Sequence, residues 1–116
     1  MTVKILHNPR CSKSREALAR LESRGLRPEI VDYLATPLSL GELRTLQRQL
    51  GVPARAMLRD GEDDYRALGL ADASLGDEQL LRAVAEHPKL LQRPVVIDGE
   101  RALIARPPEL LDDWLK

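Results

Sequence analysis

The sequence predicts an α/β fold built on a mixed sheet of about four strands, and three observations support this. The first third of the chain has the pattern of a strand, a helix and a second strand. The last quarter has two apolar runs on either side of a hairpin turn, and the stretch between, about residues 37–91, has helical periodicity. A strand–helix–strand unit joins parallel strands, whereas a two-residue turn joins antiparallel ones. The expected sheet therefore contains both kinds of pairing.

The first third of the chain contains the expected parallel pair. Residues 3–6 form a short apolar run that ends at Asn8-Pro9, and we expect a strand there. A helix should follow over about residues 12–24, because Gly25 suits the left-handed position that ends many helices. Residues 29–33 alternate in polarity and predict the second strand.

The middle of the chain is predicted to be mostly helical. Ser39 and Glu42 have the spacing of a capping box, in which each side chain bonds the backbone of the other residue. The expected elements are a helix that ends at Gly51, helical turns within 53–58 and 63–68, and a helix that Asp77 caps and that stops before Pro88.

The last quarter predicts an antiparallel hairpin and a closing helix. The expected elements are strands at 95–97 and 102–105 around the turn Asp98-Gly99, and a helix after Pro108 with Leu110, Leu111, Trp114 and Leu115 on its inner face. The whole order fits a thioredoxin-like core. We therefore expect residues 1–116 to form one domain, with a helical insertion between the second and third strands.

The composition excludes several classes of function. Lys and Arg total 18, and Asp and Glu total 18, which argues against a nucleic-acid-binding protein that works by bulk electrostatics. No apolar run is long enough to span a membrane, and residues 1–4 lack the apolar core of a signal peptide. One cysteine cannot form an internal disulfide. We expect a monomer of the reducing cytoplasm, with no membrane or nucleic-acid partner.

Cys11 is the candidate nucleophile. It follows a strand and precedes a helix, where unpaired backbone N–H groups and the helix dipole favour a thiolate. Arg10, Lys13 and Arg15 add positive charge. The alternative is a buried structural cysteine, which is common. Because Ser14 stands where a Cys-x-x-Cys pair would have its second sulfur, any resolving thiol must come from outside the chain.

Three arginines at element boundaries are candidate ligands for an oxyanion, because guanidinium groups bind such anions bidentately. They are Arg59, Arg93 and Arg106. From spacing alone, ordinary surface arginines are the commoner case. Pro94 is a candidate cis proline beside the thiol if the fold is thioredoxin-like, and otherwise a trans proline. His7 could tune the thiolate or cap the strand. One cysteine and two distant histidines do not form a zinc site.

Several segments together resemble the glutathione/glutaredoxin-coupled arsenate reductase family. The matching segments, in the family's order, are residues 7–15 (His-Asn-Pro-Arg-Cys-Ser-Lys-Ser-Arg), Tyr33-Leu34 with Pro37, 55–59, 65–71, 87–96 and 105–109. The loop Cys-Ser-Lys-Ser differs from the Cys-Gly-Thr-Ser of dedicated reductases and is similar to a short branch of the family, which also lacks a C-terminal extension. Lys13 could attract an anion or mark a different thiol substrate.

The resemblance implies a mechanism and its residues. Cys11 would attack arsenate or a similar oxyanion, and Arg59, Arg93 and Arg106 would bind it. The resemblance also implies that the thiolate and its loop are supported by His7, Asn8, Ser14, Arg15 and Pro94. It implies no bound cofactor, glutathione as co-substrate and glutaredoxin as the protein that regenerates the thiol.

Three alternatives stay open. One is a glutathione-dependent thiol oxidoreductase without arsenate activity. Another is a regulator similar to the Spx proteins, which bind RNA polymerase, although Ser14 removes their usual Cys-x-x-Cys switch. The third is a structural module with an inert cysteine.

Overall fold

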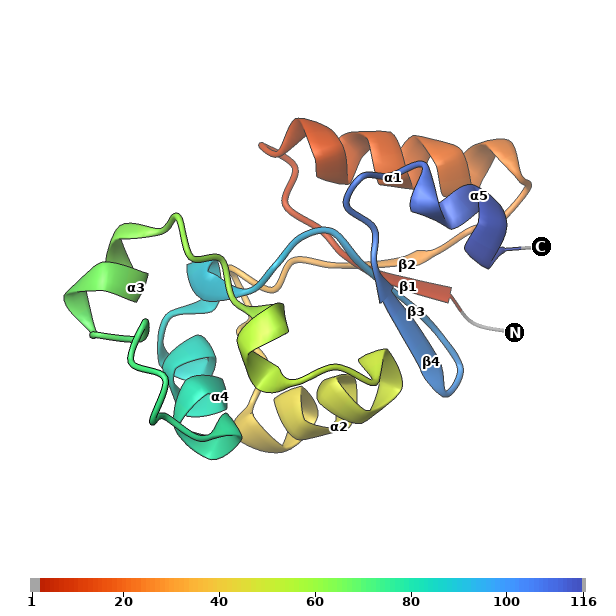
Figure 1. Cartoon of the computed structure of the whole chain (residues 1–116). Coiled ribbons are helices and arrows are strands. Elements are labelled where there is room, and N and C mark those ends of the chain that lie inside the picture. Colours follow the sequence, from red (N-terminus) through yellow and green to blue (C-terminus); the bar gives the residue numbers. More distant parts are fainter. Residues whose placement is uncertain (1–2, 116) are drawn as a thin grey trace. The chain divides into compact units, whose positions relative to one another are not determined.

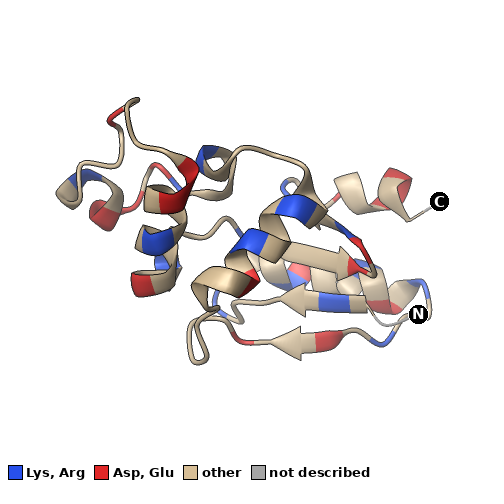
Figure 2. Ribbon diagram, turned by 90° about the horizontal axis from the view of Figure 1, so that it is seen from below, with Lys and Arg blue, Asp and Glu red and all other residues tan. Residues whose placement is uncertain are grey.

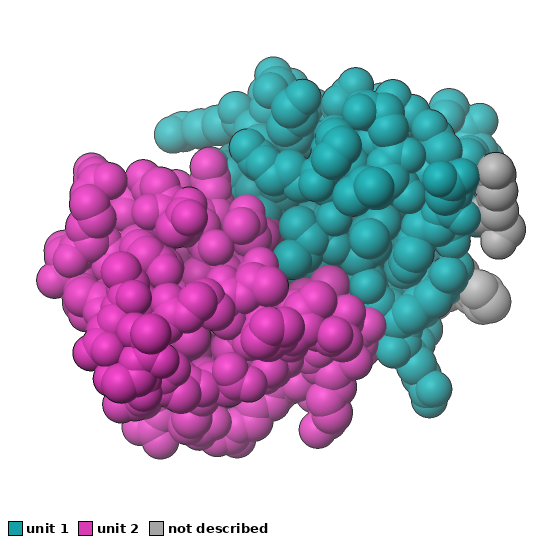
Figure 3. Space-filling model, viewed as in Figure 1, with its two compact units in different colours: residues 1–36, 93–116 teal, residues 37–92 magenta. Residues whose placement is uncertain are grey.

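The computed structural model describes residues 3–115 and separates the chain into two compact units. The first unit combines residues 1–36 with 93–116, and the second contains residues 37–92 (Figure 3). Each unit is built from its own elements. The expectation that the whole chain folds as one domain stays a prediction.

The first unit holds a four-stranded mixed sheet, as predicted. Its elements are β1 (Val3–Leu6), α1 (Ser12–Ser23), β2 (Glu29–Val31), β3 (Val95–Asp98), β4 (Arg101–Ile104) and α5 (Leu110–Trp114). The strand order is β2-β1-β3-β4. Strand β1 pairs parallel with β2 and antiparallel with β3, and β3 pairs antiparallel with β4. This mixed α/β architecture agrees with the expected thioredoxin-like core.

Helices α1 and α5 lie side by side along one face of this sheet (Figure 1). Alternate residues of β1 point into the layer between, because successive strand residues face opposite sides. The core there consists of Val3, Ile5, Ala17, Leu21, Val96, Ala105 and Leu111. Full burial of such an aliphatic side chain stabilises a fold by about 1.5–3 kcal/mol. Arg20 of α1 also pairs with Asp112 of α5 at 2.8 Å.

Strand β2 ends at Val31, two residues earlier than the pattern suggested. The Asp32 carboxylate accepts hydrogen bonds from the backbone N–H groups of Leu34 and Ala35, both at 3.1 Å. The Asp32 carbonyl accepts one from Thr36 N–H at 2.9 Å. These bonds form an aspartate turn in place of further strand pairing.

Helix α5 buries only part of the face that was expected to point inward. Leu111 is fully buried, whereas Leu110 is 44% exposed. Neighbouring residues on a helix point about 100° apart, and of these two only Leu111 faces the core. The helix begins directly after this Pro-Pro turn, because the Pro107 and Pro108 carbonyls accept the N–H groups of Leu110 and Leu111.

The second unit is helical, as the periodicity of its sequence predicted. Its elements are α2 (Leu40–Leu50), α3 (Asp63–Ala67), α4 (Asp77–Glu86) and the short 3₁₀ helices η1 (Ala54–Met57) and η2 (Pro88–Leu90). Helix α4 packs on α2, η1 and η2. The predicted capping box is present: Ser39 Oγ accepts from Glu42 N–H at 3.1 Å, and Glu42 Oε1 accepts from Ser39 N–H at 2.9 Å. Gly51 ends α2 in the left-handed conformation with φ of 67°.

The cap of α4 differs from the prediction. Gly76, not Asp77, occupies the N-cap position, and its backbone N–H donates to Gln79 Oε1 at 2.9 Å. Asp77 lies in the first turn, where its carboxylate accepts from Gln47 Nε2 at 2.8 Å and from Ala54 N–H at 3.4 Å. Asp77 therefore connects α4 to α2 and η1.

Arg55 holds together the irregular part of the second unit. Its guanidinium donates to the Tyr65 hydroxyl at 2.8 Å, to the Leu70 carbonyl at 2.6 Å and to the Asp72 carbonyl at 2.8 Å. These three acceptors come from α3 and the loop after it. One side chain thus fixes a segment that has little regular structure of its own.

Acidic and basic residues are interspersed along both units (Figure 2). No helix within residues 3–115 is long and apolar enough to cross a membrane.

Candidate active site

The loop after β1 places Cys11 at the start of α1. The His7 N–H donates to the Val31 carbonyl at 2.9 Å, which extends the pairing of β1 with β2. The Asn8 carbonyl then accepts from Cys11 N–H at 3.0 Å, and Asn8 Oδ1 accepts from Arg10 N–H at 3.0 Å. Asn8 therefore closes a tight turn around Pro9, and Cys11 becomes the N-cap residue of α1.

The surroundings of Cys11 favour its thiolate. Partial burial acts to raise the pKa of the Cys11 thiol, but hydrogen bonds from the Ser14 N–H, the Arg93 side chain and the Lys13 N–H outweigh it. The result is a pKa below the ordinary thiol value. The first turn of α1 contains no acidic residue. A partly exposed sulfur in these conditions can act as a nucleophile.

Arg93 reaches the thiol from the start of β3. Val95 pairs with Leu6, so the residues before β3 lie beside the loop that follows β1. The Arg93–Pro94 peptide bond is cis, as the expected fold implied, and the Pro94 carbonyl accepts from Ala105 N–H at 2.9 Å. Burial acts to lower the pKa of Arg93, but its contacts with Cys11 and Tyr33 raise it above the ordinary value. Arg93 therefore stays charged.

His7 and Ser14 form a buried pair beneath the loop. His7 Nδ1 lies 2.7 Å from Ser14 Oγ, and Ser14 Oγ also accepts from Asn8 N–H at 3.1 Å. Burial lowers the pKa of His7 below 6.5, Asp32 opposes this shift and Arg15 adds to it. The ring is therefore neutral at pH 7. The Ser14 hydroxyl braces the loop, whereas its backbone N–H contacts the thiol.

Two further arginines contact the backbone of the site. Arg15 Nη1 donates to the Pro9 carbonyl at 2.8 Å, across the loop that precedes Cys11. Arg106 Nη1 donates to the Arg93 carbonyl at 3.1 Å. The side chain of Arg106 is exposed. The first unit therefore brings Cys11, Arg93 and Arg106 to one end of its sheet.

Arg59 belongs to the second unit, between η1 and α3. Its backbone N–H donates to the Leu90 carbonyl at 2.7 Å, and its guanidinium pairs with Glu62 at 3.2 Å. A bridge between Leu58 and Leu91 fixes the same stretch of chain. Arg59 is thus held on a well-anchored segment of its own unit.

Tyr33 is a site residue that the sequence reasoning did not select. Its side chain is 1% exposed, and it is one of the groups that raise the pKa of Arg93. The chain contains only two tyrosines and no phenylalanine. A polar aromatic residue directly after a strand was the available signal, because a buried tyrosine hydroxyl usually has a partner.

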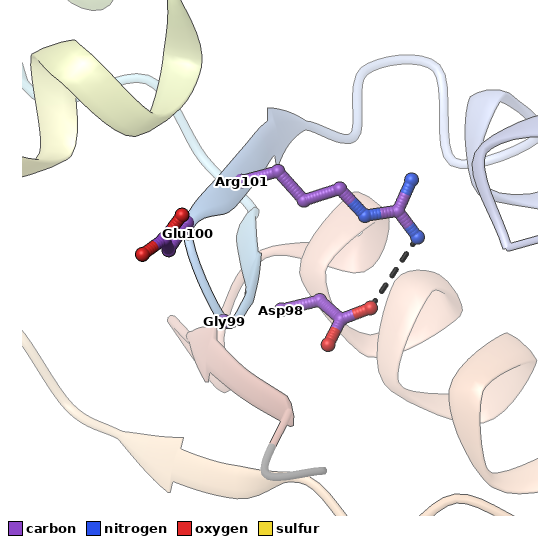
Figure 4. A pocket seen from close by; sticks show the side chains of 4 residues that line it. All are labelled: Asp98, Gly99, Glu100 and Arg101. Carbon is purple, nitrogen blue, oxygen red and sulfur yellow. Dashed lines mark hydrogen bonds and ion pairs between the residues drawn. The ribbon is translucent and has the colours of Figure 1, made fainter.

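A hollow of about 430 Å³ lies elsewhere in the first unit, at the turn between β3 and β4 (Figure 4). Asp98 and Arg101 line it with the turn and form an ion pair at 3.3 Å. Asp98 pairs with Val3, whereas Val95 pairs with Leu6. The hollow therefore lies at the opposite end of β1 from the thiol, and it is not part of the candidate site.

The arrangement suits nucleophilic attack on an anion. A thiolate supplies the electron pair, and guanidinium groups bind tetrahedral oxyanions through paired hydrogen bonds. Within the described part of the chain, no group of three or more His, Cys, Asp or Glu side chains could hold a metal ion.

Comparisons with known proteins agree with this architecture. The model of the ArsC family matches residues 6–113. The chain is 49% identical over 111 residues to a Neisseria meningitidis protein named arsenate reductase, with 95% of each chain covered. It is 51% identical over 108 residues to an uncharacterized Escherichia coli K12 protein, covering 92% of this chain and 91% of that one. A solved structure named arsenate reductase from Vibrio cholerae has a TM-score of 0.94 at 48% identity, with 97% of each chain covered. On this evidence the chain belongs to the ArsC family.

Proposed function

We propose that this protein is an arsenate reductase in which Cys11 is the nucleophile. The observation that carries the proposal is the placement of Cys11 at the start of α1, where two backbone N–H groups and Arg93 lower the pKa of its thiol. Relatives that are 44% and 49% identical over nearly the whole chain bear the name arsenate reductase.

The first step is attack of the Cys11 thiolate on arsenic. A sulfur–arsenic bond forms, and one arsenate oxygen takes up two protons and leaves as water. Arg93, Arg106 and Arg59 bind the remaining oxygens, since each guanidinium can donate two parallel hydrogen bonds to an oxyanion. His7, Asn8, Ser14, Arg15 and Pro94 keep the loop and the thiolate in place.

The second step needs a thiol from outside the chain, because Cys11 is the only cysteine. We assign this role to glutathione, whose sulfur bonds to arsenic while a second oxygen is protonated and leaves as water. The two sulfurs then join in a mixed disulfide, the electron pair of the broken sulfur–arsenic bonds stays on arsenic, and the reduced arsenic takes up one water and leaves as arsenite. Glutaredoxin reduces this mixed disulfide and so restores the Cys11 thiol, and further glutathione then reduces glutaredoxin. The protein needs no bound cofactor, and we propose that it acts as a monomer in the reducing cytoplasm.

The test is arsenate-dependent oxidation of NADPH, coupled through glutathione, glutaredoxin and glutathione reductase. The native protein should show turnover, and Cys11→Ser should show none. Turnover that persists in Cys11→Ser would contradict the assigned nucleophile. A native protein that reduces glutathione mixed disulfides but leaves arsenate unchanged would favour a general glutathione-dependent thiol oxidoreductase instead.

A further inference from the structure

Helix α5 is too short to hold its own place in the first unit. It has five residues, Leu110–Trp114, and a helix of that length is not stable in water by itself. The side chain of its N-cap residue, Glu109, forms no capping hydrogen bond with the helix. Contacts with the rest of the unit must therefore fix the point at which α5 begins.

Arg20 supplies such a contact from α1, the helix that lies beside α5 (Figure 1). Its Nη1 donates to Asp112 Oδ2 at 2.8 Å, and its Nη2 donates to Glu109 Oε1 at 3.4 Å. One guanidinium thus joins α1 to the N-cap and to the first turn of α5. A single exposed ion pair stabilises little, whereas several charges that share one fork form a network.

The Arg20 side chain is held by these carboxylates and not by its own solvation. It is 30% exposed, and its Nε is shielded from solvent with no hydrogen-bond partner among the described residues. A buried donor without an acceptor costs free energy. An arginine that was free to turn would expose this N–H to water, so we infer that the pull of the two carboxylates outweighs the cost.

Arg106, a candidate ligand of the oxyanion, lies between this attachment and the sheet. On one side, Ala105 N–H donates to the Pro94 carbonyl at 2.9 Å. On the other side, Pro107-Pro108 leads directly to Glu109, and the two proline rings restrict the backbone φ angles. A residue with one fixed neighbour can pivot about it. Because the connection to Glu109 is stiff, an ion pair that fixes Glu109 also limits how far Arg106 can move.

We propose that Arg20 is a positioning residue that holds Arg106 in place through the carboxylates of Glu109 and Asp112. Arg106 Nη1 donates to the Arg93 carbonyl at 3.1 Å, and this bond needs a fixed starting point. The effect on oxyanion binding rests on the proposed function, in which Arg106 is a ligand of the anion. The attachment itself does not, because it can be measured without any anion.

The first test is backbone hydrogen exchange of Arg20→Met, followed by NMR. The amides to follow are those of Arg106, Leu110 and Leu111, which donate to nearby carbonyls at 2.9, 3.1 and 3.0 Å. Their exchange should be about threefold to tenfold faster than in the native protein, because the turn opens more readily without the ion pairs. Unchanged exchange at these three amides would overturn the proposal.

The second test uses inorganic phosphate, an unreactive tetrahedral oxyanion, to protect Cys11 from alkylation by iodoacetamide. In Arg20→Met, the phosphate concentration that gives half protection should rise about threefold to tenfold. The pKa of the Cys11 thiol should not change, because the groups that lower it are Arg93 and two backbone N–H groups. A shifted thiol pKa, or an unchanged half-protection concentration where Arg106 binds phosphate, would overturn the positioning role.

Arg44→Met is the matched control. Arg44 joins α2 to α4 through Glu78, with its Nε 3.1 Å from Oε2. This variant also loses an ion pair between two helices, but in the second unit. It should leave the exchange of the three amides and the protection by phosphate as they are in the native protein. Equal changes in the two variants would overturn the specific role of Arg20.

Arg106→Met distinguishes a failure of this proposal from a failure of the proposed function. If phosphate protects the native protein and Arg106→Met equally, or neither of them, the assignment of Arg106 as an oxyanion ligand fails, and the exchange test decides the role of Arg20. If Arg106→Met weakens the protection, adding Arg20→Met to it should weaken the protection no further. A full additional effect in the double variant would overturn the proposal.

Discussion

Each unit of this protein contains an arginine that interacts with a buried tyrosine, and the two arginines are used differently. In the second unit, Arg55 donates to Tyr65 and to two backbone carbonyls. In the first unit, Arg93 interacts with Cys11 and Tyr33, which raise its pKa, and it helps to lower the pKa of the Cys11 thiol. Both pairs consist of an arginine and a tyrosine. The other partner of the arginine differs: it is backbone carbonyls for Arg55 and a thiol for Arg93.

The difference indicates what decides whether an arginine contributes mainly to stability or mainly to the reactivity of the site. Arg55 is bound by backbone oxygens, which keep their hydrogen-bonding capacity throughout any reaction. Arg93 is bound by a thiol, whose charge changes when it reacts. Loss of Arg55 should therefore appear in the free energy of unfolding, whereas loss of Arg93 should appear in the reactivity of Cys11. Four predictions test this contrast, in order of expected effect.

The largest effect is expected for Arg93→Met. Arsenate turnover should fall about 100-fold or more, as it does when a preorganised donor to a reacting anion is removed. The pKa of Cys11 should rise at the same time, because Arg93 contributes to lowering it. Coupled turnover and alkylation at varied pH measure both. An unaltered thiol titration in this variant would show that Arg93 does not stabilise the thiolate.

Arg55→Met should lower the free energy of unfolding by about 1–3 kcal/mol, because three acceptors lose a charged donor. The titration of Cys11 should not change. Urea denaturation can be followed by circular dichroism and by the fluorescence of Trp114, the only tryptophan, which lies in the first unit.

This experiment also tests the prediction of one domain. If the chain unfolds cooperatively, both probes should move together although Arg55 lies in the second unit. If the midpoint followed by circular dichroism shifts while the midpoint followed by Trp114 fluorescence stays at the urea concentration of the native protein, the units unfold independently.

His7 should make the stability depend on pH below neutrality. The folded protein binds a proton at His7 less readily than the unfolded chain, because burial lowers the pKa in the fold. The unfolded chain therefore gains protons first, and the free energy of unfolding should decrease as pH falls below about 6.5. One proton limits the slope to about 1.4 kcal/mol per pH unit.

Denaturation of His7→Gln between pH 7 and pH 5 checks this assignment. In this variant, the free energy of unfolding should depend less steeply on pH, because the contribution of His7 is gone. An equal slope in native protein and His7→Gln would assign the pH dependence to other groups.

The smallest effect is expected for Lys13→Gln. The Lys13 side chain is exposed, so salt screens its attraction for anions. At low ionic strength, Cys11 of the variant should react with an anionic thiol reagent about twofold more slowly than Cys11 of the native protein. This difference should vanish at high salt. Lys89→Gln, an exposed lysine of the second unit, should have no effect. A salt-independent loss would mean that Lys13 acts through the loop conformation.

The sequence predicted best those features that depend on neighbouring residues. The capping box of Ser39 and Glu42, the left-handed Gly51 and the placement of Cys11 at a helix start all follow from local chemistry. The cis bond at Pro94 followed from the expected fold, since nothing next to Pro94 determines it.

The features that the sequence did not predict depend on distant partners. Gly76 caps α4, and Asp77 in the first turn is engaged by Gln47, 30 residues away. Tyr33 raises the pKa of an arginine that follows it by 60 positions, and no periodicity encodes that interaction. The positions of the candidate oxyanion ligands were read from element boundaries and from the family resemblance, and their roles stay predictions.

The turn at Asp32 has a consequence for solubility. Strand β2 is at the edge of the sheet, and Ile30 on it is 54% exposed. Longer apolar edge strands can pair with a second molecule and cause aggregation. By taking the N–H groups of Leu34 and Ala35, Asp32 limits this edge to three residues. The same carboxylate that ends the strand ahead of Tyr33 thus shortens the edge that another chain could extend.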